Sequence, residues 1–343
     1  MMRYFTIARD LGSPRLISYN EIKVLFRKGL LKEMPPIAIL LSTYNGLPYL
    51  AEQLDSILGQ DFPEWCLYIR DDGSTDGTPQ VLRRCQEASP GRIFLLEDDP
   101  VRLGAAQSFS RLMQAVSADY LMFCDQDDIW LPDKISRTLA TMQAMEREHG
   151  PDLPLLVHSD LQLVDQRLEV LAPSFWRYQN LDPRRGESLL KLAIQNVVTG
   201  CTVMINRRLN ELALPVPPAA CMHDWWTALV AAAFGKIGFI STPLVRYRQH
   251  AANKIGAKRW GLMYILTMMV KREEARQGLL ASQAQAGAFV DRYAERLSPP
   301  MRSALGRFSH LSELGFWERR YLLIQHGMFK AGLARNIGLL LWV

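Results

Sequence analysis

The feature that most constrains the fold is a regular alternation of short apolar runs and helical patterns between residues 36 and 160. Each run is bounded by Gly, Pro or acidic residues and has no polar face, which is typical of a strand buried on both sides. In chain order the runs are "IAILL", "WCLYI", "RIFLL", "DYLMFC" and "PLLVH". Strands that alternate with helices need crossover connections, so the pattern predicts an α/β fold, Rossmann-like, with a mostly parallel sheet and helices on both faces.

The pattern changes from about residue 196. We predict a strand with Gly200 inside it, then a helix, then a strand that ends in Arg and His; the stretches are "NVVTGCTVMINRRL", "HDWWTALVAAAF" and "GKIGFISTPLVRYRQH". Beyond residue 257 only helical patterns occur, including "WGLMYILTMMVKR" and "RRYLLIQHGMFKAGLARNIGLLLWV". The predicted organisation is a lead with one amphipathic helical pattern (1–34), an α/β domain (35–256) and a helical, basic C-terminal region (257–343).

Composition sets the broad class of the protein. A chain of 343 residues with 48% hydrophobic and 22% charged residues can bury a large core. The five cysteines are odd in number and never form CxxC, so neither a disulfide framework nor a zinc site is indicated. The N-terminus lacks the unbroken apolar core of a secretory signal, and no stretch approaches the roughly 18 apolar residues that span a bilayer. We therefore expect a cytoplasmic protein.

The net charge of +5 is unevenly distributed along the chain. Residues 246–343 hold 16 Lys and Arg against 6 Asp and Glu, a net charge of +10, which leaves −5 for the remainder. A basic tail beside an acidic body predicts an anionic neighbour, either a membrane surface or a nucleic acid, and the alternative is a solvated helical face. The basic residues are spread along helices without a nucleic-acid-binding motif, so no nucleic-acid partner is expected.

An acid-rich turn, "DDGSTDGT" at 71–78, follows the second apolar run. In sheets of this kind ligands bind beyond the carboxyl ends of the strands. A carboxylate fixed there can accept hydrogen bonds from a ribose hydroxyl or a base N–H, which favours a ligand role for Asp71 and Asp72. The later Ser, Thr or Asp of the turn could instead cap the helix that follows.

A second acid-rich turn, "CDQDD" at 124–128, follows the fourth apolar run. Asp125 and Asp127 flank a single residue, and two hard carboxylate ligands at that spacing can hold one Mg²⁺ or Mn²⁺ while leaving positions for substrate phosphates. The alternative is a capping turn into the helix that starts near Pro132. No P-loop and no GxGxxG follow the first strand, so a cation and basic groups would have to neutralise the phosphates of a bound nucleotide.

Several motifs of the chain occur in the order seen in one enzyme family. They are "ILLSTYNGLPYLAEQLDSILGQ", "IRDDGSTDGT", "FCDQDDIWLPDKI", "TGCTVMINRRL", "MHDWWTAL" and "PLVRYRQHAANKIGA". The first four resemble GT-A glycosyltransferases of family 2. The last two narrow the likeness to the rhamnosyltransferase-like members that build bacterial O-antigen and capsule polysaccharides. The resemblance covers about 36–257 closely and the helical tail more loosely.

The resemblance implies a nucleotide-sugar donor, with dTDP-rhamnose favoured, in the half of the domain at about 35–130, and an acceptor in the half at about 150–256. The residues that it puts near the nucleoside are Thr43, Tyr44, Asn45, Asp72 and Gly104. Asp125 and Asp127 match the DxD motif that holds a divalent metal, Mg²⁺ or Mn²⁺, against the diphosphate, and His250 is the candidate third ligand.

Alternation along a strand puts Arg246, Arg248 and His250 on one face, from which the arginines could reach the diphosphate. The alternative for His250 is a surface residue in a loop. One departure from the family concerns Arg102 and Ser108, where relatives often carry Asn, so the donor-side contacts are expected to differ.

Asp224 in "HDWW" corresponds to the catalytic base of these inverting enzymes, although it could also cap the helix that follows it. Trp225 and Trp226 are expected to divide between stacking on an acceptor sugar, assigned to Trp225, and the core. Gly200 would let its strand approach the acceptor closely, or would simply mark a bulge.

The acceptor implied by the resemblance is a glycan or a lipid-linked glycan. The basic amphipathic helices of the tail then fit peripheral contact with the cytoplasmic face of the inner membrane, and the alternative is a helical subdomain that packs on the catalytic domain. Two other functions are weighed. A nucleotidyltransferase would be expected to carry a basic, Gly-rich loop that "LSTYNGLPYL" lacks. A non-catalytic glycan- or partner-binding module has no evident need for Asp125, Asp127 and Asp224 together.

Overall fold

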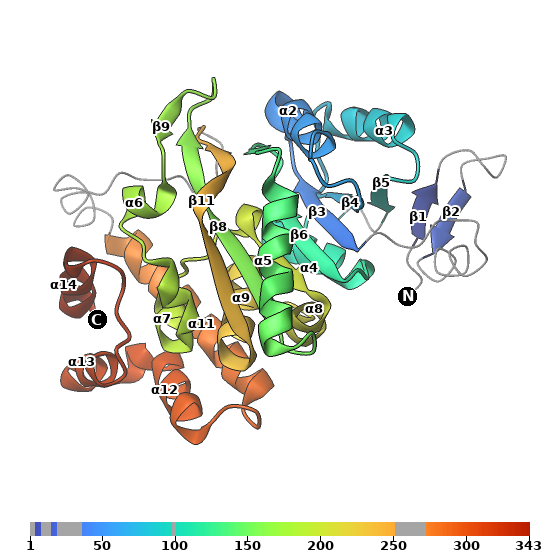
Figure 1. The fold of residues 1–343 in the computed structure, drawn as a ribbon. Helices are drawn as coiled ribbons and strands as arrows, with labels where there is room; N and C mark the ends of the chain where they lie inside the picture. Colours follow the sequence, from blue (N-terminus) through green and yellow to red (C-terminus); the bar gives the residue numbers. More distant parts are fainter. Residues whose placement is uncertain (1–3, 8–14, 19–35, 98–100, 251–271) are drawn as a thin grey trace.

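The structure, a computed structural model, describes residues 4–7, 15–18, 36–97, 101–250 and 272–343 (Figure 1). Within these residues the strands form one eleven-stranded sheet in the order β2-β1-β5-β4-β3-β6-β10-β8-β11-β7, with β9 paired to β8. The strands are β1 (Tyr4–Ile7), β2 (Arg15–Ser18), β3 (Ile37–Thr43), β4 (Trp65–Asp71), β5 (Ile93–Glu97), β6 (Tyr120–Cys124), β7 (Ile129–Trp130), β8 (Leu155–Val164), β9 (Val170–Ala172), β10 (Met204–Asn206) and β11 (Lys236–Arg248).

The helices follow the alternation expected from the sequence. Those of the α/β part are α2 (Leu47–Leu58), α3 (Thr78–Ala88), α4 (Ala105–Ala115), α5 (Lys134–His149), α6 (Phe175–Gln179), α7 (Leu189–Ile194), α8 (Arg207–Ala213) and α9 (His223–Phe234), with 3₁₀ turns η1 (Pro183–Glu187) and η2 (Gly200–Thr202). The C-terminal region comprises α11 (Arg272–Tyr293), α12 (Pro299–Ser309), η3 (Leu311–Glu313), α13 (Phe316–Gln325) and α14 (Leu333–Trp342).

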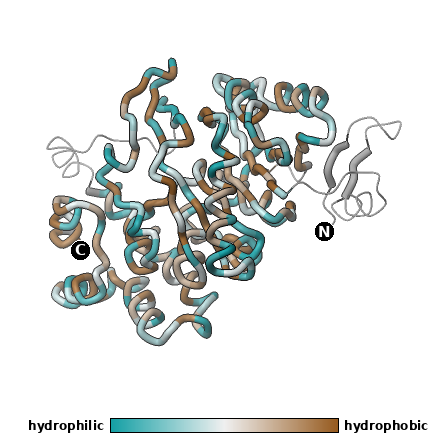
Figure 2. The backbone as a smooth tube through the Cα atoms, viewed as in Figure 1, coloured by the Kyte–Doolittle hydropathy of each residue, from teal (hydrophilic) through white to brown (hydrophobic). Residues whose placement is uncertain are grey.

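The central strand β3 explains the layered architecture. Its side chains alternate between the two faces, so Ile37, Ile39 and Leu41 pack with α2, α3 and α5, whereas Ala38 and Leu40 pack with α4, α9 and the C-terminal helices. Both faces of the strand are buried, which is why its sequence is an unbroken apolar run. Figure 2 shows that the hydrophobic stretches of the chain run through these central strands.

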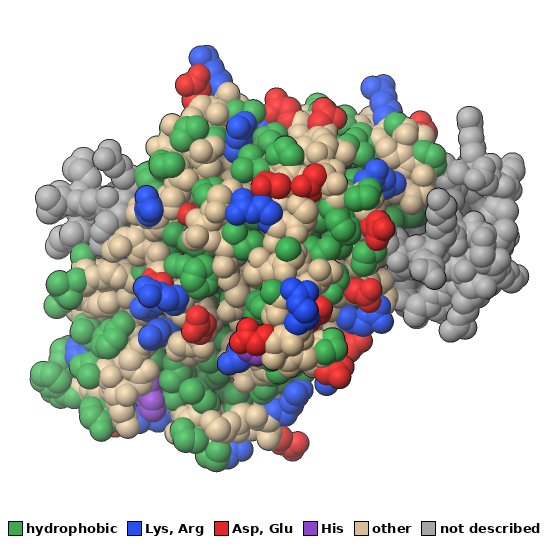
Figure 3. All heavy atoms as spheres, viewed as in Figure 1, with side chains coloured by type: hydrophobic (Ala, Val, Ile, Leu, Met, Phe, Trp, Pro, Cys, Tyr) green, Lys and Arg blue, Asp and Glu red, His purple; other side chains and the backbone are tan. Residues whose placement is uncertain are grey.

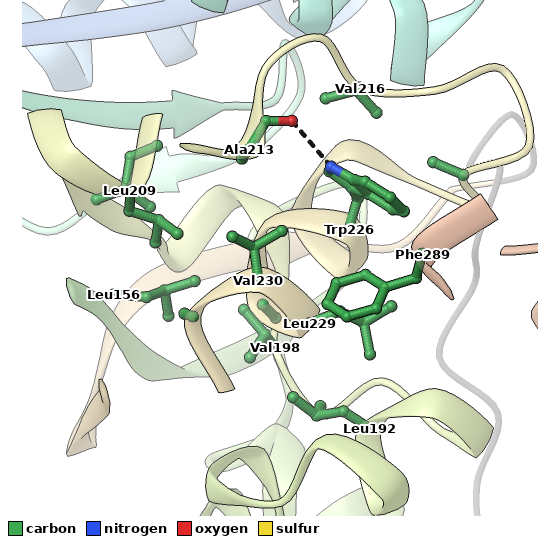
Figure 4. Packing of buried hydrophobic residues seen from close by; sticks show 14 of the residues in the cluster. Leu156, Leu192, Val198, Leu209, Ala213, Val216, Trp226, Leu229, Val230 and Phe289 are labelled. Carbon is green, nitrogen blue, oxygen red and sulfur yellow. Dashed lines mark hydrogen bonds between the residues drawn. The ribbon is translucent and has the colours of Figure 1, made fainter. Parts of the chain in front are cut away.

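The C-terminal helices share a core with the α/β part. The Trp226 ring of α9 contacts Phe289 and Tyr293 of α11, with ring centroids 5.4 and 6.0 Å apart (Figure 4). The Trp226 indole also donates a 2.9 Å hydrogen bond to the Ala213 carbonyl, so its one polar group is satisfied in the core. The tail therefore packs on the α/β body as a helical subdomain, the alternative that the sequence left open.

Helices on both faces of an α/β sheet are confirmed. The sheet is mixed: the pairs β3–β4, β3–β6, β4–β5 and β8–β11 are parallel, and β10 runs antiparallel to both of its neighbours. The prediction that a strand contains Gly200 is wrong. Gly200–Thr202 form a 3₁₀ turn, and the strand β10 is short and begins after it. The long helical pattern at the C-terminus is divided, because Gly327 and Gly332 adopt positive φ between α13 and α14.

Some predictions concern residues outside the described ranges. In the lead, the described residues form the strands β1 and β2, and the rest of 1–34 is not described. The predicted domain boundary near 256 lies in 251–271, which the structure does not describe. The predicted helical stretch "WGLMYILTMMVKR" also lies outside the described residues, except for its last residue, Arg272.

Candidate active site

The two acid-rich turns meet at one edge of the sheet. β3 pairs in parallel with β4 on one side and β6 on the other, so the three strands end at the same edge. The Asp72 amide donates to the Thr43 carbonyl at 2.8 Å, which continues the pairing of β3 and β4 into the turn. The carboxyl ends of these strands are where a ligand is expected in such a sheet.

Asp71 holds its own turn together. Its carboxylate accepts hydrogen bonds from the Thr43 hydroxyl at 2.8 Å, the Ser74 hydroxyl at 2.6 Å and the Ser74 amide at 2.9 Å. Asp76 accepts from the Thr78 amide at 2.9 Å where α3 begins, so this third acid of the turn acts as a helix-capping group. Local backbone structure therefore accounts for Asp71 and Asp76, and leaves Asp72 as the acid of this turn that organises the site.

Asp72 is buried and fixes the loop that enters α4. Its carboxylate accepts from Arg70 Nη1 at 2.5 Å and from the amides of Leu103 and Gly104, both at 2.7 Å. Gly104 adopts a φ of 76°, a conformation that a side chain would strain. Sequence reasoning missed Arg70, although a charged residue inside the apolar run "WCLYIRD" signals a buried ion pair, because an unpaired charge there would be costly.

Gln126, the residue between Asp125 and Asp127, ties the two turns together. Its side-chain oxygen accepts from the Tyr44 amide at 2.8 Å, and its nitrogen donates to the Tyr44 carbonyl at 3.1 Å. A Cβ on Gly46 would lie 2.5 Å from the Gln126 oxygen, so glycine leaves room for this pairing. The loop after β3 and the loop after β6 are therefore held as one unit.

The Tyr44 ring and Asn45 complete the loop after β3. The Arg102 guanidinium lies over the Tyr44 ring at 3.9 Å. Asn45 has a φ of 48°, and its side-chain oxygen accepts from the Thr75 amide at 2.8 Å. The structure thus gathers Thr43, Tyr44, Asn45, Asp72 and Gly104 at one end of the edge, as the sequence predicted; their contact with a nucleoside stays a prediction.

We expect Gln126→Ala to weaken donor binding about ten-fold while lowering the free energy of unfolding by only about 1–3 kcal/mol, because two hydrogen bonds that hold the loops together are lost. Isothermal titration with donor and chemical denaturation measure the two effects. Gln277→Ala is the matched control, since Gln277 makes an exposed bond to Glu273 on α11. Equal donor affinity in both variants would remove Gln126 from the site.

The second turn brings three carboxylates together. Asp127 Oδ2 lies 2.8 Å from His250 Nε2, so the structure joins two of the three predicted metal ligands. Asp128, which sequence reasoning did not single out, is buried; one of its oxygens accepts from the Arg248 amide at 3.2 Å, and the other has no hydrogen-bond partner among the described residues. It is the third acid of "CDQDD", and its position directly after a buried strand was the available signal.

Asp125 belongs to two candidate sets of metal ligands, one with Asp127 and His250 and one with Asp128 and Cys201. Its ligand atom lies within 4.8 Å of those of Asp128 and Cys201, a second possible donor set for a metal. Burial, and then the charges of Asp127 and Asp224, raise the pKa of Asp125 to about 7. Burial and the neighbouring carboxylates also raise the pKa of the Cys201 thiol well above its usual value, so the thiol is held protonated, and a metal binds the thiolate.

The two arginines of β11 differ in burial. Arg246 is exposed, whereas Arg248 is buried and donates to the carbonyls of Asp127 at 3.0 Å and Gln166 at 2.8 Å, and to the carboxylate of Glu52. Residues 246–248 pair in regular register with residues 162–164 of β8, so alternation still puts both arginines on one face, and only Arg248 is covered by neighbouring loops. Arg248 therefore positions the second turn, and diphosphate contact stays a prediction for Arg246.

Asp224 begins α9 and faces the second turn. It is buried against Gly200, where an added Cβ would lie 3.2 Å from Asp224 Oδ2, so glycine makes room for the carboxylate. Burial raises the pKa of Asp224 to about 6, against hydrogen bonds from the backbone that lower it, including one from the Trp225 amide at 2.6 Å. The position of Gly200 is thus explained by Asp224; its contact with an acceptor stays a prediction.

Of the two tryptophans of "HDWW", one is in the core, as expected. Trp226 is buried in the core, and Trp225 is half-buried, with its indole donating to the Leu192 carbonyl of α7 at 2.7 Å. Stacking of Trp225 on an acceptor sugar stays a prediction. The site therefore consists of the paired loops after β3 and β6, the carboxylates of the second turn, and the buried carboxylate of Asp224. Such a site can bind a charged ligand and can offer it a proton acceptor.

Comparison with known proteins finds similarity over the part of the chain that carries the two acid-rich turns. A sequence model of the family described as Glycosyl transferase family 2 matches residues 38–149, which include both acid-rich turns. The chain is 28% identical over 228 residues to the dTDP-rhamnosyl transferase RfbG of Shigella flexneri, covering 63% of this chain and 74% of that protein. It is 27% identical over 231 residues to the putative teichuronic acid biosynthesis glycosyltransferase TuaG of Bacillus subtilis (strain 168), covering 66% and 83%.

A solved structure shows the same fold. The crystal structure of S. aureus TarS 1–349 superposes with a TM-score of 0.50 at 16% identity, over 84% of this chain and 78% of that chain. The match extends beyond residues 38–149 and therefore includes part of the chain that the family's sequence model does not cover.

Proposed function

Because the chain belongs to family 2 of the glycosyltransferases and has their GT-A fold, we propose that it is a metal-dependent inverting transferase with a rhamnose donor. The family acts with nucleotide sugars. The named relative RfbG supports a dTDP-linked rhamnose, and the teichuronic acid biosynthesis in the name of TuaG supports a hydroxyl of a surface-glycan acceptor. The enzyme would work in the cytoplasm, at the face of the membrane where a lipid-linked acceptor is presented.

The observation that carries the proposal is the position of Asp224 relative to the second turn. Both Asp127 and Asp224 raise the pKa of Asp125, so the base candidate and the paired carboxylates lie within electrostatic reach of one another. A sugar held between them would have its leaving group on the side of the paired acids and its other face toward Asp224. Such a position of the sugar would favour attack from the face opposite the leaving group, and hence inversion.

The residues of the second turn fit a divalent cation. Asp125 and Asp127 are hard oxygen ligands, and His250 already contacts Asp127, a donor set suited to Mn²⁺ or Mg²⁺. When bound, such a cation would neutralise charge on the departing diphosphate. The alternative set of Asp125, Asp128 and Cys201 includes a soft sulfur ligand, which Mg²⁺ and Mn²⁺ disfavour, so we assign the cation to the first set.

The other residues have roles in binding and proton transfer. Asp224 would take the proton of the acceptor hydroxyl while the oxygen of that hydroxyl bonds to C1 of the sugar. The bond between C1 and the diphosphate oxygen would break at the same time, and its electron pair would stay on the diphosphate. The loop pair joined by Gln126 would hold the nucleoside beside Tyr44. Exposed Arg246 would contact the phosphates, and half-buried Trp225 would form one wall for the acceptor.

A thermal-shift screen of the purified protein tests the proposal. dTDP-rhamnose, UDP-galactose and UDP-glucose are each added with and without Mn²⁺, and we expect dTDP-rhamnose with Mn²⁺ to give the largest shift. A ligand at about 100 times its dissociation constant adds about 2.7 kcal/mol to the free energy of unfolding. Mn²⁺ alone and dTDP alone are the controls. A shift with oligosaccharide but with no donor would instead identify a non-catalytic glycan-binding module.

A further inference from the structure

Exposed hydrophobic side chains are concentrated on α13 and α14. Half of the fourteen large hydrophobic side chains exposed among the described residues lie on these two helices, and Trp317, Leu333 and Leu341 are 77%, 78% and 71% exposed. We call the set the C-terminal apolar face; it comprises Phe316, Trp317, Tyr321, Ile324, Leu333, Ile337 and Leu341. Figure 3 shows hydrophobic side chains gathered over α13 and α14, at the lower left of that view. A contiguous exposed surface of this kind usually marks an interaction site.

Helices α13 and α14 each have one apolar side buried in the core, and the exposed residues form a second apolar side on the same helices. Trp317, Tyr321 and Ile324 recur at helical spacing on α13, while Leu322 and Leu323 of the same helix are buried in the core. On α14, Leu333, Ile337 and Leu341 recur every four residues, while Leu339 is buried. The core therefore does not account for the C-terminal apolar face.

The charges around this face are positive. Between 316 and 342 the basic residues are Arg319, Arg320, Lys330 and Arg335, and the one acidic residue is Glu318. Arg335 is buried against the body and burial lowers the pKa of Lys330, so Arg319 and Arg320 are the basic residues that lie beside the face. Glu318 Oε2 accepts from the Gly315 amide at 2.9 Å and so caps α13. The guanidinium carbon of Arg320 lies over the Phe316 ring, 3.5 Å from the ring centroid, so a positive charge lies directly on the apolar face. The matching occupant is apolar in depth and anionic at its surface.

The face is fastened to the part of the molecule that carries the base candidate. Arg335 of α14 donates to the Gln179 carbonyl at 2.8 Å, and the Ala331 amide donates to Gln195 Oε1 at 2.5 Å, directly after α7. Helix α7 in turn accepts the Trp225 indole, next to Asp224. A surface bound to α13 and α14 would thus have a fixed position relative to the acceptor side of the site.

We propose that the C-terminal apolar face docks in the plane of a lipid bilayer that contains anionic phospholipid. No helix of the described residues is both long and apolar enough to cross a membrane, so these short helices would lie in the interface, with aromatic rings at headgroup depth. The link to a lipid-linked acceptor rests on the proposed function, whereas the lipid binding itself does not depend on it.

Co-sedimentation with vesicles of phosphatidylglycerol and phosphatidylcholine, and with phosphatidylcholine alone, tests the proposal on the full-length protein. We expect binding to the anionic vesicles that falls about ten-fold or more in the Trp317→Ser/Tyr321→Ser/Leu333→Ser variant, and about five-fold in Arg320→Gln. The matched control is Val170→Ser/Leu171→Ser, which removes two exposed apolar side chains of β9 and should bind like the wild type. Circular dichroism and transfer to a soluble acceptor show whether each variant is folded and active.

Two outcomes would overturn the proposal. Binding to anionic vesicles that is equal in the triple variant and the β9 control would show that another surface binds lipid. A wild-type dimer in sedimentation velocity that becomes monomeric in the triple variant, without vesicle binding, would identify a second copy of the chain as the occupant. A different result would bear on the proposed function alone. If the wild type binds vesicles but shows no transfer activity, the proposed function is contradicted and the docking surface stands.

Discussion

Replacing Asp224 with asparagine is expected to lower kcat by about 10²–10⁴-fold and to leave donor binding unchanged, because removal of a general base commonly costs that much. The amide keeps the size of the side chain and an oxygen that can still accept the Trp225 amide, so the start of α9 is preserved. It cannot take a proton from the acceptor hydroxyl. The loss should appear in kcat, with the donor dissociation constant from calorimetry within about two-fold of the wild type.

The pH dependence gives this prediction a second readout. Burial raises the pKa of Asp224 to about 6, and only the deprotonated form accepts a proton. In the wild type at saturating Mn²⁺, which would keep the proposed ligand Asp125 ionised, log(kcat/KM) should therefore rise with unit slope up to about pH 6 and then level off, since the protonated base is inactive below its pKa. In Asp224→Asn this acidic limb should be absent from the residual activity.

Asp291→Asn, an exposed change on α11, is the matched control and should retain wild-type rates and the full acidic limb. Wild-type activity in Asp224→Asn would remove Asp224 from the mechanism. An unchanged acidic limb in a slow variant would assign the titrating base to another carboxylate and leave Asp224 a role in the start of α9.

The parts of the fold that could be predicted are those written locally in the sequence. β3 is an unbroken apolar run because both of its faces are covered, and the same reasoning finds β4, β5, β6 and the start of β8. β10 could not be bounded, because its three residues pair antiparallel between β6 and β8, and that pairing is set by strands far away in the chain. Propensity alone does not record such contacts.

The candidate site shows the same division. The sequence brought Asp125, Asp127 and Asp224 forward as chemical groups, and in the structure the charges of Asp127 and Asp224 both raise the pKa of Asp125. It could not show that Arg248 is turned inward, because alternation assigns a face to a residue and does not say which carbonyls lie above that face. The pairing of Gln126 with Tyr44 joins residues 82 positions apart and is likewise invisible to local patterns.

Replacing Asp127 with alanine is expected to abolish the metal-dependent part of donor binding and to lower transfer by about 10³-fold, because the leaving diphosphate then loses much of its charge stabilisation. The backbone carbonyl that accepts from Arg248 is kept in this variant, so the second turn should hold its shape. His250 loses the carboxylate that it contacts at 2.8 Å, which removes a second member of the donor set.

The comparison with Cys201→Ser makes this prediction specific to one donor set. If the cation is held by Asp125, Asp127 and His250, Cys201→Ser should retain Mn²⁺ binding within a few-fold, while Asp127→Ala and His250→Ala lose it. If it is held instead by the buried set of Asp125, Asp128 and Cys201, the serine variant should lose Mn²⁺ and the histidine variant should not. Electron paramagnetic resonance of added Mn²⁺ reads this out without turnover. Full transfer by the wild type after chelation with EDTA would mean that the paired carboxylates work without a cation. Full transfer by Asp127→Ala would mean that Asp127 is not needed, and the acid-rich turn would then need a different explanation.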